Sequence, residues 1–284
     1  MTTLTLNGTR LDVEERGTGA PVVFVHGDIS DRRTWAEQLD AFARAGRRAI
    51  AYSRRGHWPA PPPTAAEGSK VEAHVADLAA VIEKVAGGRA DVVANSYGGY
   101  VALALAKERP ELVRSLVLCE PAVVPLALDL PPTPEAMAAL AARDPPLARA
   151  MDELLPLVGA AIERYAAGDA QAGGEMFARY HVPHALAKAG VAQAVRDNSA
   201  VHAAALLGGH FSPYSEADAR AVQAPTLLVT GARSPPYLLA LSERLAKLLP
   251  RAEWAQLPEV GHFMHVEDAA AFDKLVLAFL ARQR

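Results

Sequence analysis

The chain has 284 residues, 51% of them hydrophobic, with a formal net charge of -3 and a pI near 6.3. A chain of this length and composition buries a sizeable core, either as one large domain or as a core domain with an insertion. The charge balance and the lack of a basic stripe exclude nucleic acid as an expected partner. The single cysteine, Cys119, excludes an intrachain disulfide and is typical of a reducing compartment, so we expect a cytoplasmic protein.

Several other classes of protein are not predicted. Residues 1–10 lack the apolar run of a signal peptide, and no run of about 18 apolar residues predicts a membrane span. The nine histidines show no metal-ligand spacing, and no glycine-rich nucleotide loop follows a predicted strand. We therefore expect no cofactor, no metal, and no membrane or nucleic-acid partner. The expected partner is a small-molecule substrate, and the oligomeric state stays open.

Predicted strands and helices alternate along much of the chain. Asn7-Gly8 separates two short alternating stretches and accepts the positive φ angles of a tight turn, which predicts a hairpin. The predicted strands cover residues 4–6, 11–15, 21–26, 49–52, 91–94, 113–119, 225–229 and 252–257. The predicted helices cover residues 35–45 (with capping-box spacing of Thr34 and Glu37), 71–85, 98–109, 236–249 and 268–281. The expected fold class is therefore α/β, with a doubly wound, mostly parallel sheet.

The alternation breaks over residues 124–221, which are rich in alanine and contain no predicted strand. Thr133-Pro134 is a typical helix start, with a cap residue followed by proline at the first helical position. We interpret this segment as a helical cap or lid, hinged at Gly208-Gly209, on a core of residues 1–123 and 222–284. Its expected place is over the carboxyl ends of the strands, where open α/β sheets bind ligands. The alternative is an extension packed elsewhere.

The strongest chemical signal is the sequence Ala94-Asn95-Ser96-Tyr97-Gly98 between a predicted strand and a predicted helix. A serine on such a strand-to-helix turn is pushed out of the sheet, and the turn is so tight that its flanking positions must be small. Gly98 meets this demand, and Ala94 stands where glycine is usual. The N-terminus of the following helix favours an oxyanion at the site.

These residues resemble the α/β-hydrolase fold family, over nearly all of the chain except the insertion. His26-Gly27, after the third strand, is similar to the family's oxyanion loop, and Gly261-His262-Phe263 is similar to its catalytic histidine loop. The resemblance implies that Ser96 is the nucleophile and His262 its general base, with His265 as the fallback. It also implies that the backbone N–H groups of Asp28 and Tyr97 form the oxyanion hole, which agrees with the general arrangement at such a turn.

The acid of the predicted triad departs from the family's usual pattern. The loop after the seventh strand, residues 231–235, contains no carboxylate. Glu120, which ends the sixth strand, is the best replacement, and certain haloalkane dehalogenases look similar in placing a glutamate there. The chain order Ser96, Glu120, His262 fits the family. The rival acids are Asp28, Asp31 and Glu267, and the other interpretation of Glu120 is a capping or hinge carboxylate.

The leading hypothesis is a carboxylesterase-like serine hydrolase that cleaves a small or medium apolar ester, or a related acyl bond, through an acyl-enzyme. Thioester, lactone, amide and C–C cleavage use the same parts and are not separated by sequence. Trp58, Phe263 and Tyr214 are the candidate substrate-binding residues. The alternatives are a non-hydrolytic enzyme of the same fold, such as a lyase, cofactor-free oxygenase or cyclase, and a ligand-binding protein with a degraded triad.

Overall fold

The computed structural model describes residues 2–62 and 70–283, and its strands form a single eight-stranded sheet in the order β1-β2-β4-β3-β5-β6-β7-β8. The strands are β1 Thr2–Leu6, β2 Thr9–Arg16, β3 Ala20–Val25, β4 Arg47–Tyr52, β5 Ala90–Asn95, β6 Val113–Cys119, β7 Thr226–Gly231 and β8 Ala252–Leu257. The β1–β2 and β2–β4 pairs are antiparallel, and every other pair is parallel. The predicted α/β fold with a mostly parallel sheet is thus confirmed.

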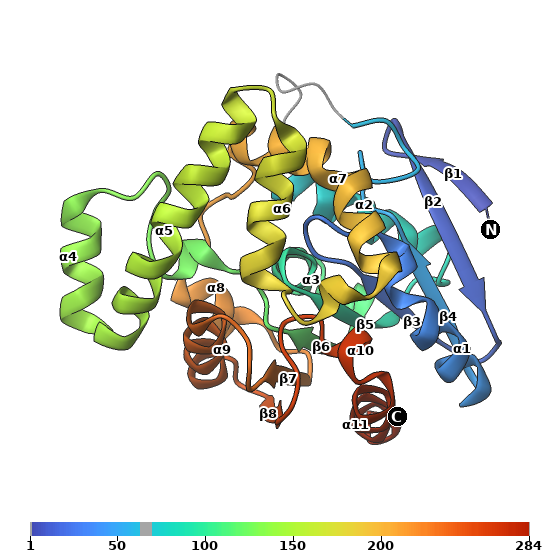
Figure 1. Cartoon of the computed structure of the whole chain (residues 1–284). Coiled ribbons are helices and arrows are strands. Elements are labelled where there is room, and N and C mark those ends of the chain that lie inside the picture. The colour runs from blue at the N-terminus through green and yellow to red at the C-terminus, as the bar shows by residue number, and fades with distance from the viewer. Residues whose placement is uncertain (1, 63–69, 284) are drawn as a thin grey trace.

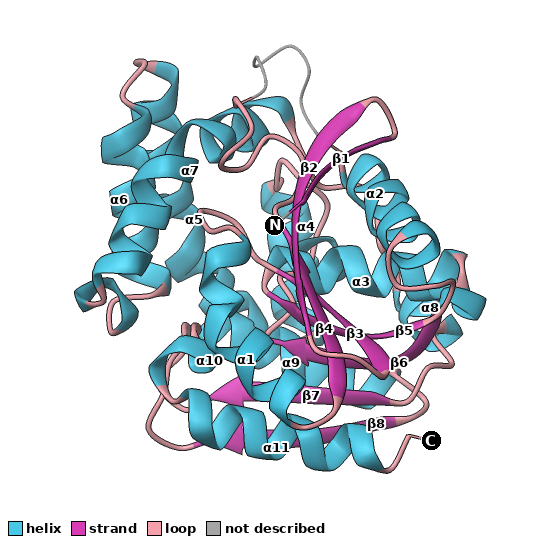
Figure 2. Ribbon diagram, turned by 90° about the vertical axis from the view of Figure 1, so that its right-hand side faces the viewer, coloured by secondary structure: helices cyan, strands magenta, loops and turns pink. Residues whose placement is uncertain are grey.

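Helices cover both faces of the sheet (Figures 1 and 2). On one face lie α1 Ala36–Arg44 and α11 Ala269–Ala281, whose apolar side chains pack with β3, β4 and β7. On the other face lie α2 Val71–Lys84, α3 Tyr97–Glu108, α8 Glu216–Ala221 and α9 Pro236–Leu248. The short α10, Met264–Glu267, leads from the loop after β8 into α11.

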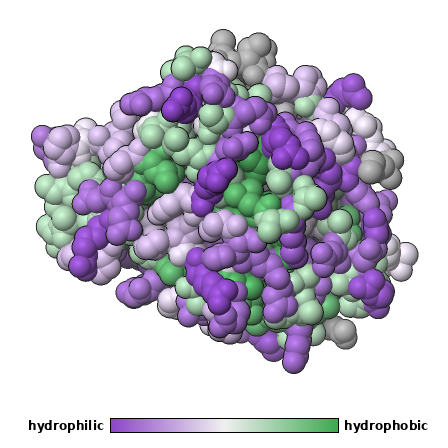
Figure 3. Space-filling model, viewed as in Figure 1, coloured by the Kyte–Doolittle hydropathy of each residue, from purple (hydrophilic) through white to green (hydrophobic). Residues whose placement is uncertain are grey.

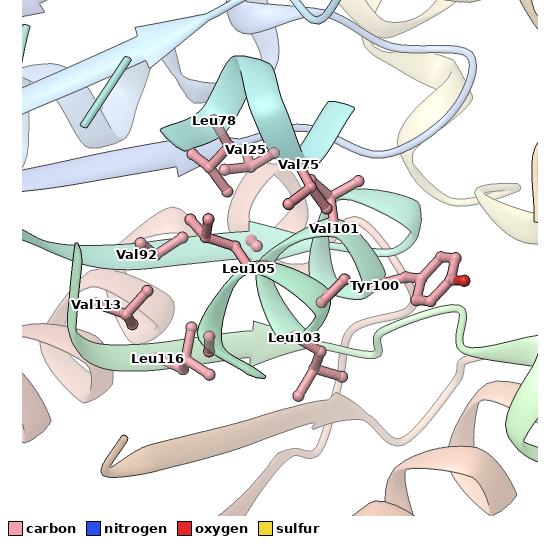
Figure 4. Packing of buried hydrophobic residues seen from close by; sticks show 14 of the residues in the cluster. Val25, Val75, Leu78, Val92, Tyr100, Val101, Leu103, Leu105, Val113 and Leu116 are labelled. Carbon is pink, nitrogen blue, oxygen red and sulfur yellow. The ribbon is translucent and has the colours of Figure 1, made fainter. Parts of the chain in front are cut away.

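Helix α3 lies at the centre of the core, as Figure 4 shows. Val101 and Leu105 face Val75 and Leu78 of α2 and the strand residues beneath them. Every residue from Tyr97 to Ala106 is buried, as expected for a helix that is apolar around its whole circumference. This packing fixes the start of α3, and with it the position of Ser96, against the carboxyl ends of β3 and β5.

The segment between β6 and β7 is helical, as predicted, with α4 Pro134–Arg143, α5 Pro145–Ala166, α6 Ala170–His181 and α7 Ala189–Gly208. The predicted start at Thr133-Pro134 is confirmed, because Thr133 Oγ1 accepts the Ala136 N–H at 3.1 Å. In Figure 2, α5, α6 and α7 lie together to one side of the sheet. Helix α8 instead packs against α3 and α9, so the helical segment ends earlier than the expected boundary at residue 221.

One predicted helix start is wrong. Thr34 does not cap a helix over residues 35–45, because it lies inside a short 3₁₀ turn, η1 Arg32–Trp35, that Asp31 caps. The Thr34 hydroxyl donates to the Asp31 carbonyl at 3.0 Å, and α1 begins only at Ala36. No helix within residues 2–62 and 70–283 is long and apolar enough to cross a membrane.

Candidate active site

Ser96 stands between β5 and α3 in a strained backbone conformation, with φ +55° and ψ -124°. A side chain in this region of φ is costly and is kept only where the surrounding packing enforces it. The neighbouring glycines show how tight this packing is. A Cβ on Gly98 would lie 2.5 Å from the His26 carbonyl oxygen, and one on Gly27 would lie 2.7 Å from the Cβ of Ser96. The turn therefore requires glycine at both positions, as predicted for Gly98.

His262 and Glu120 lie in contact, although 142 residues separate them in the chain. The Nδ1 atom of His262 is 2.6 Å from Oε2 of Glu120, and both side chains are buried. A carboxylate only accepts hydrogen bonds, so the proton of the neutral imidazole is on Nδ1 and Nε2 is free to accept one. The other oxygen of Glu120 accepts the Gly231 N–H at 2.7 Å, which ties the acid to the end of β7.

The rival acids are all engaged elsewhere. Asp31 caps η1 and pairs with Arg33, and its Oδ2 accepts from Asn198 at 2.8 Å. Glu267 accepts the Gly261 N–H at 2.8 Å, which holds the histidine loop rather than the imidazole. Asn95 also holds this loop, since its Nδ2 donates to the His262 carbonyl at 3.1 Å. The fallback base His265 is buried against Trp35, with ring centroids 3.9 Å apart, and does not line the cavity beside Ser96.

A buried arginine organises the loop after β3. The Arg54 guanidinium donates to the carbonyl oxygens of His26 and Gly27 at 3.1 and 3.0 Å, while its backbone N–H donates to His26 Nε2 at 2.8 Å. Desolvation, followed by the charge of Arg54, lowers the pKa of His26 well below its usual range. The neutral ring then donates from Nδ1 to the Gly27 carbonyl at 2.8 Å. These bonds turn both carbonyls of the loop toward Arg54.

The two predicted oxyanion donors are the backbone N–H groups of Tyr97 and Asp28. Tyr97 is the first residue of α3, and an amide at this position has no acceptor within its own helix. Asp28 lines the same cavity as Ser96. Its carboxylate is turned to the Arg54 guanidinium, with Oδ1 at 2.8 Å, as expected for an anion that would otherwise oppose an oxyanion. Although burial alone would raise the pKa of Asp28, His210 and Arg54 outweigh it and hold this pKa well below its usual range.

Ser96 opens into a cavity of about 640 Å³, a size suited to a small or medium ligand. One wall is apolar and comes largely from α5, with Met151, Leu154, Leu155, Val158 and Ile162. Leu130 and Leu207 also line it, and because they are 40% and 43% exposed they mark its mouth. On the face drawn in Figure 3, hydrophobic patches appear among polar side chains over α5 and near α6. Residues of α5, α6 and α7 thus line the same cavity as Ser96.

The three predicted substrate-binding residues do not line this cavity. The Trp58 ring lies under the Arg33 guanidinium, 3.7 Å from the ring centroid, and the backbone N–H of Trp58 donates to Asn198 Oδ1 at 2.9 Å. Phe263 is buried in an apolar cluster with Ile29 and residues of α6 and α7. Tyr214 packs edge-on against Tyr100 in the main core. In each case packing against a neighbouring element, rather than a ligand, accounts for the aromatic ring.

Sequence reasoning missed a polar pair in the cavity wall. His181 of α6 and Tyr237 of α9 are buried and joined by a 2.8 Å contact between Nε2 and the phenol oxygen. Since His181 Nδ1 donates to the Phe177 carbonyl at 2.9 Å, Nε2 accepts the tyrosine proton. The His181 and His262 rings lie 6.3 Å apart. The available signal was the position of Tyr237, because it follows the loop after β7 that usually carries the triad acid in this family.

Comparison with known proteins identifies the class. The model of a family described as the alpha/beta hydrolase family matches residues 22–275, so the chain belongs to this family. It is 29% identical to 2-hydroxymuconate semialdehyde hydrolase of Pseudomonas sp. (strain CF600), over 96% of this chain and 91% of that protein. Hydrolases are thus among its relatives.

Solved structures show the same fold. A thermophilic esterase from Thermogutta terrifontis superposes with a TM-score of 0.77 at 22% identity, covering 99% of this chain and 98% of that one. The enol-lactonase from Burkholderia xenovorans LB400 gives a TM-score of 0.74 at 19% identity, covering 99% of this chain and 100% of that one. At these identities the likeness concerns the fold alone.

Proposed function

We propose that the protein is a serine hydrolase that cleaves a carboxylic ester, or a related acyl bond, of a small or medium apolar substrate. The observation that carries the proposal is the strained Ser96 at the wall of a largely apolar cavity, next to Asn95, whose side chain donates to the carbonyl of His262 in a buried His262–Glu120 pair. A serine hydroxyl is nearly inert at neutral pH and needs a base to activate it. An imidazole held by a carboxylate through Nδ1 presents such a base at Nε2.

In the proposed reaction Ser96 attacks the carbonyl carbon while His262 takes the hydroxyl proton. The backbone N–H groups of Asp28 and Tyr97 stabilise the oxyanion, and the positive end of α3 adds to this. His262 returns the proton to the leaving alcohol, and the acyl group stays on Ser96. Water, deprotonated by His262, then releases the acid. Glu120 keeps the imidazole in the right tautomer and stabilises its cation.

The test combines turnover with covalent labelling. p-Nitrophenyl acetate, butyrate, hexanoate and decanoate measure ester turnover, and a fluorophosphonate reports an activated serine by mass spectrometry. We expect turnover and a single labelled residue, Ser96. Ser96→Ala should lose the label and lower kcat by several orders of magnitude, down to a residual rate about 10³-fold above water. Its melting temperature should stay close to that of the wild type.

Two outcomes would overturn the proposal. If Ser96→Ala kept a tenth or so of the activity, Ser96 would not be the nucleophile, since a triad without its serine loses far more. If the folded wild-type protein turned over no acyl substrate and took no label, a non-hydrolytic enzyme or a ligand-binding protein of the same fold would be favoured instead.

A further inference from the structure

One wall of the cavity beside Ser96 is polar, in contrast to the apolar wall from α5. Three polar side chains form this wall: Asp28 from the loop after β3, His202 from α7 and His210 just beyond the end of α7. The same three also line a small enclosed space of about 10 Å³ next to the main cavity, so they are close neighbours. We call them the polar wall.

Two atoms of the polar wall lack a hydrogen-bond partner among residues 2–62 and 70–283. His202 is 2% exposed and its Nδ1 is bonded to the Tyr165 hydroxyl at 2.7 Å, while its Nε2 is unpartnered. His210 Nδ1 donates to the Ala205 carbonyl at 3.2 Å, and its Nε2 lies 3.6 Å from Asp28 Oδ2, beyond a normal hydrogen bond. Buried polar atoms are nearly always satisfied, so the unpartnered Nε2 of His202, a residue that lines the cavity, points to a polar ligand group.

The hydrogen-bonding chemistry of the polar wall limits which ligand groups can bind there. The Asp28 carboxylate only accepts hydrogen bonds, and it repels a second carboxylate. His202 Nε2 donates or accepts, depending on which way the Tyr165 hydroxyl bonds to Nδ1. A hydroxyl group both donates and accepts, so it satisfies the wall in either state. A ketone or ether oxygen offers nothing to the Asp28 carboxylate.

We infer that the polar wall is a subsite for a substrate hydroxyl, and that the natural substrate is a hydroxylated ester or related acyl compound. Its apolar arm lies along α5, and its hydroxyl-bearing arm faces His202 and Asp28. This inference rests on the proposed hydrolase function and specifies the substrate class for the same site. A site built to bind a hydroxyl discriminates strongly against analogues without one, because its own buried polar atoms are then left unpaired.

The experiment compares kcat/KM for ethyl hexanoate, 2-hydroxyethyl hexanoate and ethyl 3-hydroxyhexanoate, so that the hydroxyl is on either arm. We expect one hydroxylated ester to be preferred over ethyl hexanoate by about tenfold or more, as for one good hydrogen bond. Methylating that hydroxyl should abolish the gain in the wild-type protein. His202→Phe should also abolish it, because the ring shape is kept and only a polar atom is lost.

His265→Phe is the matched control. His265 is as buried as His202, and its ring nitrogens also have no partner within the described part of the chain, but it lies outside the cavity. This variant should keep the preference. Equal turnover of all three esters, a methoxy ester as good as the hydroxy ester, or a preference that survives in folded His202→Phe would each overturn the subsite alone. No turnover of any ester by folded protein would overturn the proposed function and the subsite with it.

Discussion

At the residue scale, backbone strain is concentrated at the carboxyl ends of neighbouring strands. Among the described residues, the non-glycine positions with positive φ are Asn7 in the hairpin turn, Ile29, Ser96 and Glu120. The last three follow the neighbouring strands β3, β5 and β6. Each such conformation costs on the order of 1–3 kcal/mol and persists where the structure over-determines it, which is typical of functional sites. The strain therefore coincides with the loop, the serine and the glutamate that the proposed mechanism uses.

Glu120→Gln tests the unusual acid. A glutamine still accepts the Gly231 N–H, but its amide group facing His262 would favour the wrong imidazole tautomer. We expect kcat on p-nitrophenyl butyrate to fall by a large factor, up to about 10⁴ as in a serine protease, with little change in KM. Glu267→Gln is the control, since the Glu267 carboxylate accepts from the backbone of the same loop. A nearly silent Glu120→Gln would remove Glu120 from the mechanism.

At the element scale, the sequence predicts the sheet well and the cavity poorly. Buried parallel strands are continuous apolar runs, and the predicted bounds agree closely with β3 to β7. The Ser96 turn follows from the local need for small residues, whereas the histidine loop is predicted from its resemblance to the family. The inward faces of α5, α6 and α7 depend instead on how these helices pack together. Helix α7 mixes alanine and valine with scattered polar residues, so no apolar stripe singles out the face that carries His202.

Helix α5 offers a test of the apolar wall at Gly159. This glycine lines the cavity, and a Cβ built on it meets nothing within 4 Å. Gly159→Phe should therefore narrow the cavity and shift the preferred p-nitrophenyl ester toward acetate. The helix should not be destabilised, because glycine in a helix interior costs about 0.5–1 kcal/mol relative to alanine. The measurement is the chain-length profile of kcat/KM together with the melting temperature.

Gly190→Phe is the matched control for this prediction. Gly190 lies near the start of α7, and its Cβ would also meet nothing within 4 Å, but it lines a groove away from Ser96. Its chain-length profile should equal that of the wild type. An unchanged profile in folded Gly159→Phe would mean that the acyl chain does not follow α5.

At the scale of the whole molecule, the site depends on burying many histidines in neutral form. The histidines whose pKa desolvation lowers, and which are at most 3% exposed, are His26, His57, His74, His181, His202 and His265. Burial lowers the pKa of His181 and His265 to about 3 and that of His202 to about 4. Most of them lie around the cavity or the loop after β3. Protonation of these histidines therefore affects both the site and the stability of the fold.

This arrangement predicts steep loss of stability in acid. In the unfolded chain these histidines take up protons as pH falls through 6.5, while the folded protein keeps them neutral to a much lower pH. Their contribution is therefore complete above pH 6.5 and is lost progressively below it, each group adding a slope on the order of 1 kcal/mol per pH unit. Asp91 and Asp273 act in the opposite direction, because burial raises their pKa, that of Asp273 to about 6.

The six histidines outweigh the two aspartates. The free energy of unfolding should therefore be nearly constant from pH 8 to 7 and fall steeply between pH 6.5 and 4. Urea unfolding followed by circular dichroism at each pH measures this directly. In His265→Phe the free energy of unfolding should fall less steeply in acid than in the wild type, by on the order of 1 kcal/mol per pH unit. The reason is that this variant removes one buried histidine without touching the cavity. A free energy of unfolding that is flat from pH 7 to 5 would mean that these rings are protonated, or exposed to water, in the folded protein.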